Sequence, residues 1–156
     1  MSVEGTEKVS KLLNKALKME LTAVKQYLYN AALLRDWGFD NLAKIEVKEA
    51  YEELEHVNKF SDRILFLNKN PKFDGPERIK KVNSVEDIIK CNLSMELDAV
   101  KTYKTFIKAC LDSKDYGSYK IFLDVLIDEE SHVEHLMKQK NLIKTVGIEG
   151  FLHAQE

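Results

Sequence analysis

The chain has 156 residues, of which 44% are hydrophobic and 32% charged, with only six glycines and two prolines. This length and composition predict a single helix-rich domain, residues 1–156, that is long enough to bury a hydrophobic core. The net charge of −2 argues against a nucleic-acid-binding protein, which needs a basic face. No stretch has the ~20 apolar residues that span a bilayer, and the first residues lack a signal-peptide pattern, so we expect a cytoplasmic protein with no membrane partner.

Four long helical patterns follow one another along the chain. Apolar residues recur in them at the i, i+3/i+4, i+7 spacing of amphipathic helices. Gly38, within "DWGFDN", suits the C-terminal cap of the first helix, and "SVED" at 84–87 is a capping box that opens the third. Gly147 separates a short last segment, "IEGFLHAQE", which we expect to form a fifth helix. The four long helices are predicted at residues 6–36, 41–67, 84–112 and 117–145.

The segment between the second and third helices, "NKNPKFDGPERIKKVNS", contains both prolines and cannot continue a helix. Its extended residues reach ~50 Å at ~3.3 Å each, whereas a helix of about 27 residues is only ~40 Å long. The segment is therefore long enough to run from one end of a bundle to the other. Two helical hairpins joined in this way form an all-α four-helix bundle of ferritin-like connectivity, with a long crossover between helices 2 and 3.

A nine-residue motif occurs twice, as "MELTAVKQY" and "MELDAVKTY", with seven identical positions and an offset of 76 residues. The same offset relates two Glu-x-x-His motifs, at 53–56 and 129–132. The glutamates of the nonapeptides, Glu20 and Glu96, each precede the glutamate of the following motif by 33 residues. The duplication thus provides two equivalent sets of one glutamate and one Glu-x-x-His motif.

The spacing of 33 residues has a geometric meaning, because residues equidistant from the turn of an antiparallel hairpin lie level with each other. The midpoints fall at the two predicted turns, directly after Asp36 and directly after Asp112. The histidine of each motif lies on the same helix face as its glutamate. Four carboxylates and two imidazoles therefore converge at mid-bundle, where buried carboxylates require a compensating cation. The predicted metal ligands are Glu20, Glu53, His56, Glu96, Glu129 and His132.

This ligand set is rich in oxygen, with one imidazole per metal, and suits iron or manganese. Its composition is that of the di-iron carboxylate bundles, in which two helices give one Glu each and two give Glu-x-x-His. A single Glu-x-x-His is most often part of a solvated surface, and a helical interaction bundle with incidental buried acids is the non-enzymatic alternative. The two matched spacings favour the metal site, since the fold alone does not require them.

Four further residues neighbour the predicted ligands. Asp128 and Glu52 each precede a motif glutamate, and we hypothesise that each orients the histidine of the other half, because metal-bound histidines usually donate their free N–H to a carboxylate. An ordinary surface acid is the alternative for both. Tyr27 and Tyr103 lie two turns beyond a predicted metal glutamate, where we expect buried core tyrosines, with electron donation during O₂ chemistry as the alternative.

The sequence resembles bacterioferritins over essentially its whole length, through "MELTAVKQY", "EELEH", "RILFL", "MELDAVK", "DEESH" and "FLHAQ". The resemblance implies a homo-oligomeric shell of 24 subunits, with a di-iron ferroxidase centre inside each subunit and ferric mineral in the cavity. The ligand assignment that it implies is Glu20 and His56 for one iron, Glu96 and His132 for the other, and Glu53 and Glu129 as bridges.

Leu54 departs from the family pattern. Bacterioferritins hold a haem between twofold-related subunits through a methionine directly after the first bridging glutamate, and leucine, which stands here, has no lone pair for iron. We therefore expect Leu54 to be a packing residue at a subunit interface. The shell would then be haem-free, or would receive haem from a second, methionine-bearing subunit.

The resemblance implies iron storage and detoxification, in which Fe²⁺ is oxidised to Fe³⁺ with O₂ or H₂O₂ and stored as mineral. A small di-iron peroxidase or oxidase of the rubrerythrin type, without a storage shell, is the alternative function. The absence of C-x-x-C pairs and the tail that resembles the bacterioferritin C-terminus weigh against it.

Overall fold

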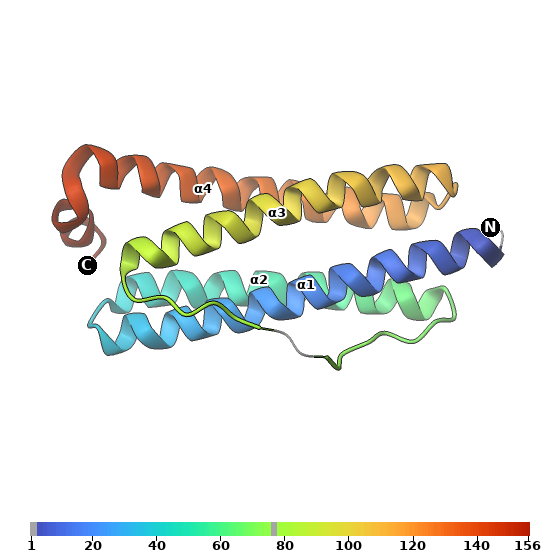
Figure 1. Cartoon of the computed structure of the whole chain (residues 1–156), viewed down its shortest axis with the longest axis horizontal. Coiled ribbons are helices and arrows are strands. Elements are labelled where there is room, and N and C mark those ends of the chain that lie inside the picture. The colour runs from blue at the N-terminus through green and yellow to red at the C-terminus, as the bar shows by residue number, and fades with distance from the viewer. Residues whose placement is uncertain (1–2, 76–77) are drawn as a thin grey trace.

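The computed structural model describes residues 3–75 and 78–156, and these form a bundle of four long helices (Figure 1). α1 packs mainly against α2 and α3 against α4, as two antiparallel hairpins. The ferritin-like four-helix bundle predicted from the sequence is confirmed. Among the described residues, no helix combines the length and the apolarity that a membrane span needs. The helices are α1, Val3–Asp36; α2, Asp40–Phe66; α3, Val85–Asp112; and α4, Tyr116–Gln155.

Local capping fixes where the helices begin and end. Gly38 takes a φ of 90°, and the Phe39 amide behind it donates to the Leu34 carbonyl at 2.8 Å, so that α1 closes at the predicted turn. Ser84 accepts a hydrogen bond from the Asp87 amide at 3.0 Å, as the capping box predicts. These turns set the register that brings residues equidistant from them to the same height in each hairpin.

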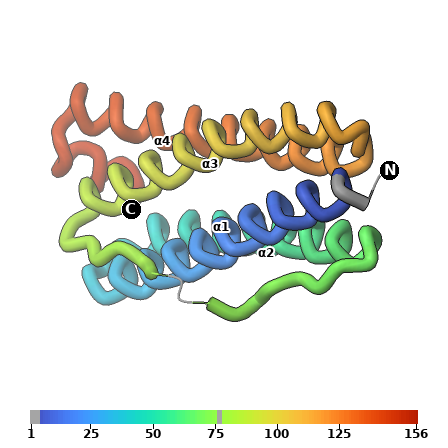
Figure 2. The backbone as a smooth tube through the Cα atoms, turned by 45° about the vertical axis from the view of Figure 1, so that its right-hand side comes forward, coloured from blue at the N-terminus to red at the C-terminus, as the bar shows by residue number. Residues whose placement is uncertain are grey.

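The crossover between α2 and α3 runs from one end of the bundle to the other along the α1–α2 hairpin (Figures 1 and 2). Among its contacts with α1, the Lys69 ammonium pairs with Glu7 at 2.7 Å, the Lys72 amide donates to Asn14 at 2.8 Å, and the Lys80 amide donates to Gln26 at 2.7 Å. The predicted end-to-end crossover is therefore confirmed. Pro76, one of the two prolines expected to break the helical pattern, lies outside the described residues.

α4 is longer than the sequence predicts, since it continues past residue 145 to Gln155. The segment expected as a fifth helix forms the last part of α4, which a kink at Gly147 (φ 76°, ψ 166°) turns across the end of the bundle (Figure 1). Phe151 anchors this segment with a fully buried ring. The Glu156 carboxylate accepts hydrogen bonds from the amides of Asn41 and Leu42 at 3.2 and 3.3 Å, so the tail caps the beginning of α2.

The hydrophobic core consists of two large clusters, one toward each end of the bundle. The cluster at the turn between α3 and α4 contains four aromatic rings with centroids 5.2–6.2 Å apart. The cluster at the opposite end is mainly aliphatic and includes Leu34, Ile88, Leu136 and Phe151. Buried acidic and imidazole side chains occupy the middle of the bundle, between these two clusters.

Candidate metal centre

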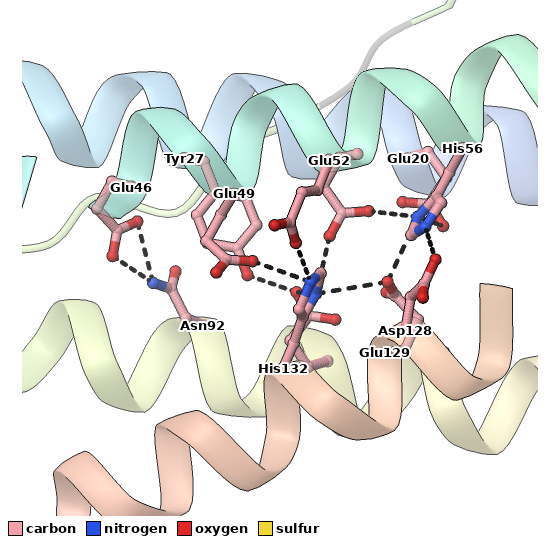
Figure 3. A network of polar contacts seen from close by, with 12 residues as sticks. Glu20, Tyr27, Glu46, Glu49, Glu52, His56, Asn92, Asp128, Glu129 and His132 are labelled. Atoms are coloured by element: carbon pink, nitrogen blue, oxygen red, sulfur yellow. Dashed lines mark hydrogen bonds and ion pairs between the residues drawn. The ribbon is translucent and has the colours of Figure 1, made fainter. Parts of the chain in front are cut away.

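Six buried side chains from all four helices meet at the middle of the bundle (Figure 3). α1 and α3 contribute one glutamate each, and α2 and α4 contribute one Glu-x-x-His motif each. Every one of these residues is at most 7% exposed. The structure thus brings together all the residues that the sequence predicts as ligands: Glu20, Glu53, His56, Glu96, Glu129 and His132.

The six side chains form two groups of four that share Glu53 and Glu129. Within each group, one ligand atom of every residue lies within 4.8 Å of the others. This spacing lets each group surround one cation, with the two shared carboxylates between the two positions. The first group is completed by Glu20 and His56, and the second by Glu96 and His132.

Both histidines turn Nδ1 toward the shared carboxylates. Nδ1 of His56 lies 3.0 Å from Glu53 Oε2 and 3.4 Å from Glu129 Oε1. Nδ1 of His132 lies 3.3 Å from Glu53 Oε1 and 3.5 Å from Glu129 Oε1. The two imidazoles therefore approach the same pair of carboxylates from opposite sides.

The other ring nitrogen of each histidine contacts an acid on the opposite hairpin. Nε2 of His56 lies 2.9 Å from Asp128 Oδ2, and Nε2 of His132 lies 2.7 Å from Glu52 Oε2. These contacts confirm the pairing that was hypothesised from the repeat. Sequence reasoning missed Glu49, whose Oε2 also lies 3.0 Å from His132 Nε2. The available signal was its position one helical turn before Glu53.

Tyr27 and Tyr103 are buried, as predicted, and each donates a hydrogen bond to a glutamate of the centre. The Tyr27 hydroxyl donates to Glu96 Oε1, and the Tyr103 hydroxyl donates to Glu20 Oε1 at 2.5 Å. Each tyrosine lies on the opposite hairpin from the glutamate that it contacts. The hairpins are therefore cross-linked at the site by two equivalent phenol–carboxylate contacts.

Comparison with known proteins shows which family the sequence of this chain belongs to. The ferritin family, described as a ferritin-like domain, matches residues 10–146. The bacterioferritin of Brucella melitensis biotype 1 is 36% identical over 149 residues, which cover 96% of this chain and 92% of that protein. The chain belongs to the bacterioferritins. The bacterioferritin of Rhodobacter capsulatus has the same identity and coverage, and that of Streptomyces coelicolor is 31% identical over 145 residues, 93% of this chain and 87% of that protein.

Several buried polar atoms of this bacterioferritin have no hydrogen-bond partner among the described residues. Four of them belong to the two ligand groups: Oε1 of Glu53, Oε2 of Glu96, Oε1 of Glu129 and Nδ1 of His132. Orphaned buried atoms of this kind are costly in a folded protein, and each needs an explanation such as an ion. A donor set of carboxylate oxygens and imidazole nitrogens facing one another fits a pair of divalent metal ions.

The electrostatics of the metal-free centre reflect its burial. Burial and the neighbouring Glu53 carboxylate raise the pKa of Glu20 to about 8. Burial alone lowers the pKa of both histidines, but contacts with the surrounding glutamates outweigh it and raise the pKa of His56 to about 11 and that of His132 to about 12. Without metal, the imidazoles therefore carry the positive charge that the carboxylates require.

A cavity of about 170 Å³ between α1 and α3 opens onto the centre. Its lining includes Glu20, Glu96 and Glu129 of the centre, and Thr22 and Asp98 nearer the surface. Thr22 and Asp98 also line a larger outer cavity of about 460 Å³. Ions and small oxidants are small enough to use such an opening.

Leu54 lies outside the centre, although it directly follows Glu53 in the sequence. Its side chain is 38% exposed on α2, and Tyr51, one turn earlier on the same helix, is 66% exposed. The interface role predicted for Leu54 remains a prediction.

Proposed function

We propose that this bacterioferritin binds two Fe²⁺ ions per chain at the six-residue centre, oxidises them to Fe³⁺ with O₂ or H₂O₂, and stores the ferric product as mineral inside a shell of 24 copies. The observation that carries the proposal is the pair of four-residue groups that share Glu53 and Glu129. The orphaned oxygen and nitrogen atoms that face one another in these groups support it further.

Each residue of the centre has a role in this proposal. Glu53 and Glu129, which both groups share, would hold both Fe²⁺ ions, and their negative charge would favour the ferric product. The ions supply the electrons for reduction of the oxidant. Glu52 and Asp128 accept the Nε2–H of the two histidines, which leaves each Nδ1 free to bind metal. The terminal pairs are Glu20 with His56 and Glu96 with His132.

Removal of one bridging carboxylate tests the centre. We expect Glu53→Ala and Glu129→Ala to lose the fast phase of Fe²⁺ oxidation, followed by ferric absorbance after anaerobic Fe²⁺ is mixed with O₂ or H₂O₂. Glu55→Ala and Glu130→Ala are matched controls, because these exposed acids neighbour the bridges in sequence. Circular dichroism establishes that the variants remain folded. Oxidation as fast as in the wild type in both bridge variants would rule out the assigned centre.

The mass of the assembled protein tests the storage shell. A shell of 24 copies of the 18.0 kDa chain has a mass of about 432 kDa, which native mass spectrometry measures directly. Because Leu54 offers no lone pair to haem iron, we propose that a shell of this chain alone is haem-free. Haem bound to the assembly would indicate a second, methionine-bearing subunit. A dimer would instead favour a small di-iron peroxidase or oxidase without storage.

A further inference from the structure

Around the centre, the two halves of the internal repeat differ in the polarity of the residues at equivalent positions. At an offset of 76 residues, four polar side chains at the Tyr27 end are matched by four apolar side chains at the Tyr103 end. All eight are buried except Glu49, which is partly buried. The two metal positions therefore have equivalent ligands but different surroundings. The matched pairs are Glu46 with Phe122, Glu49 with Val125, Asn30 with Phe106, and Asn92 with Ala16.

At the polar end, a hydrogen-bond network holds the carboxylate of Glu46, which is only 8% exposed (Figure 3). The Asn92 side-chain amide donates to its two oxygens at 2.9 and 3.1 Å, and that of Asn30 donates at 3.3 Å. Gln26 continues the network from Asn30 to the backbone of Lys80 in the crossover. Three other segments of the chain, α1, α3 and the crossover, thus hold one carboxylate of α2.

The hydrogen bonds of this network favour the ionised form of Glu46, although burial outweighs them in the metal-free protein. Both carboxylate oxygens accept hydrogen bonds from neutral amides, which stabilise the charged form. Burial acts in the other direction and raises the pKa of Glu46 to about 8, with the neighbouring acids Glu49 and Glu96 adding to the rise. A divalent cation nearby opposes these effects, because an opposite charge favours the ionised carboxylate.

A second surplus carboxylate lies directly at His132. Nε2 of His132 lies 2.7 Å from Glu52 and 3.0 Å from Glu49. The single N–H at this nitrogen can donate a well-directed hydrogen bond to only one of these two acids. Glu49 Oε2 is also among the buried atoms without a hydrogen-bond partner in the described residues. Asp128, at 2.9 Å, is the acid paired with the equivalent nitrogen of His56.

The surroundings of the other position are aromatic. Phe122, which stands where the repeat has Glu46, lies 5.8 Å from the Tyr103 ring and 5.2 Å from Phe60, measured between ring centroids. Val125, which stands where the repeat has Glu49, is fully buried. These side chains add no charge to the position formed by Glu20 and His56.

We infer that the two metal positions are unequal, and that the position of Glu96 and His132 binds a divalent cation first and more tightly because Glu46 and Glu49 add negative charge beside it. The inference rests on the proposed function only in requiring that metal binds at the centre. The Glu49 carboxylate lies 3.0 Å from Nε2 of His132, and opposite charges attract strongly where water is excluded. The apolar surroundings of the other position contribute no such attraction.

Anaerobic titration with Zn²⁺ of the assembled, metal-free protein tests the inference. We expect two ions per chain, the first bound at least about tenfold more tightly than the second. In crystals loaded with one Zn²⁺ per chain, anomalous scattering is expected at the position of Glu96 and His132. Equal occupancy of the two positions, or preference for the position of Glu20 and His56, would overturn the inference.

Substitutions identify the cause of the inequality. Glu49→Gln and Glu46→Gln remove one charge each with little change of shape, and each is expected to weaken the first Zn²⁺ and leave the second unchanged. Glu55→Gln, an exposed acid on the same helix, is the matched control and should change neither. If a variant does not fold, the occupancy of the two Zn²⁺ positions in wild-type crystals still tests the inference. Two Zn²⁺ ions bound with equal affinity would contradict only this inference. Failure to bind stoichiometric Zn²⁺ would overturn the proposed centre itself.

Discussion

The hydroxyl of Tyr103 donates a 2.5 Å hydrogen bond to Oε1 of Glu20, although the two residues are 83 positions apart and lie on different hairpins. Tyr27 and Glu96 make the equivalent contact in the opposite direction. Each terminal glutamate of the centre is therefore held from across the bundle. The packing of one hairpin on the other thus determines the position of the ligands in both.

Loss of the Tyr103 hydroxyl should weaken metal binding at the adjacent position. A hydrogen bond to a charged group contributes about 1.5–3 kcal/mol, so we expect Tyr103→Phe to reduce Zn²⁺ affinity at the position of Glu20 by roughly 10- to 100-fold. Anaerobic calorimetric titration measures this change. Tyr51→Phe is the control, because Tyr51 is 66% exposed. An affinity unchanged by Tyr103→Phe would show that the phenol does not position Glu20.

Metal binding should release protons. The pKa values of His56 and His132 are raised to about 11 and 12, so both imidazoles are protonated at neutral pH in the metal-free protein. Each metal ion that binds through Nδ1 must displace such a proton, and the affinity for metal therefore falls as the pH falls. We expect acidification of a weakly buffered anaerobic solution on addition of Zn²⁺, followed with an indicator dye.

Variants without one imidazole provide the control for this experiment. His56→Ala is expected to release fewer protons per chain than the wild type, since one protonated ring is absent. His153→Ala, whose ring lies near the C-terminus and outside the centre, should release as many as the wild type. The absence of proton release at neutral pH, or tighter metal binding at lower pH, would contradict the assigned protonation of the centre.

The ligand set could be predicted from the sequence because repeat spacing and hairpin geometry together fix the height and face of each residue. Glu49 and Glu46 could not be found in this way, since the repeat replaces them with Val125 and Phe122. The position of Glu49 one turn before Glu53 indicates only the helix face. The contacts of Glu49 with His132 and of Glu46 with Asn92 join the two hairpins, and spacing within α2 does not specify them.

The end of α4 shows a second limit of local patterns. Gly147 indicates in the sequence where the long helix is interrupted, but the backbone angles of this residue do not specify where the following segment packs. Burial of Phe151 and the hydrogen bonds of Glu156 with the beginning of α2 determine that position. The hydrogen bonds of Glu156 join residues more than a hundred positions apart.

Introduction of a thioether should create a haem site. The resemblance to bacterioferritins places the haem-ligating methionine at position 54, where this chain has a leucine that is 38% exposed. We expect wild-type protein to lack a Soret band and Leu54→Met to acquire one after expression with added haem precursor. Leu65→Met, at another exposed position of α2, is the matched control and should remain colourless. A Soret band in the wild-type homo-oligomer would contradict the assignment.

Gly117 is required by the packing of Arg63 at the beginning of α4. A Cβ atom at position 117 would lie 2.6–2.7 Å from the Arg63 guanidinium. That guanidinium is held by Asp115 at 2.6 Å and Ser118 at 2.9 Å, so it cannot move without breaking charge-assisted hydrogen bonds. Alanine has a helix propensity about 1 kcal/mol more favourable than that of glycine, but loss of the Arg63 hydrogen bonds costs about 1.5–3 kcal/mol.

We therefore expect Gly117→Ala to lower the free energy of unfolding by about 1 kcal/mol, measured by urea denaturation. In an Arg63→Ala background the same change should stabilise the protein, because only the helix propensity remains. Burial raises the pKa of Asp115, but hydrogen bonds from Ser118 and Arg63 outweigh it, so the pKa is lowered. The stability that the Arg63–Asp115 contact contributes is therefore present at neutral pH and is lost as the pH falls through that lowered value. The cost of Gly117→Ala should accordingly shrink in acid, and a stabilising effect in the Arg63 protein at neutral pH would refute the packing argument.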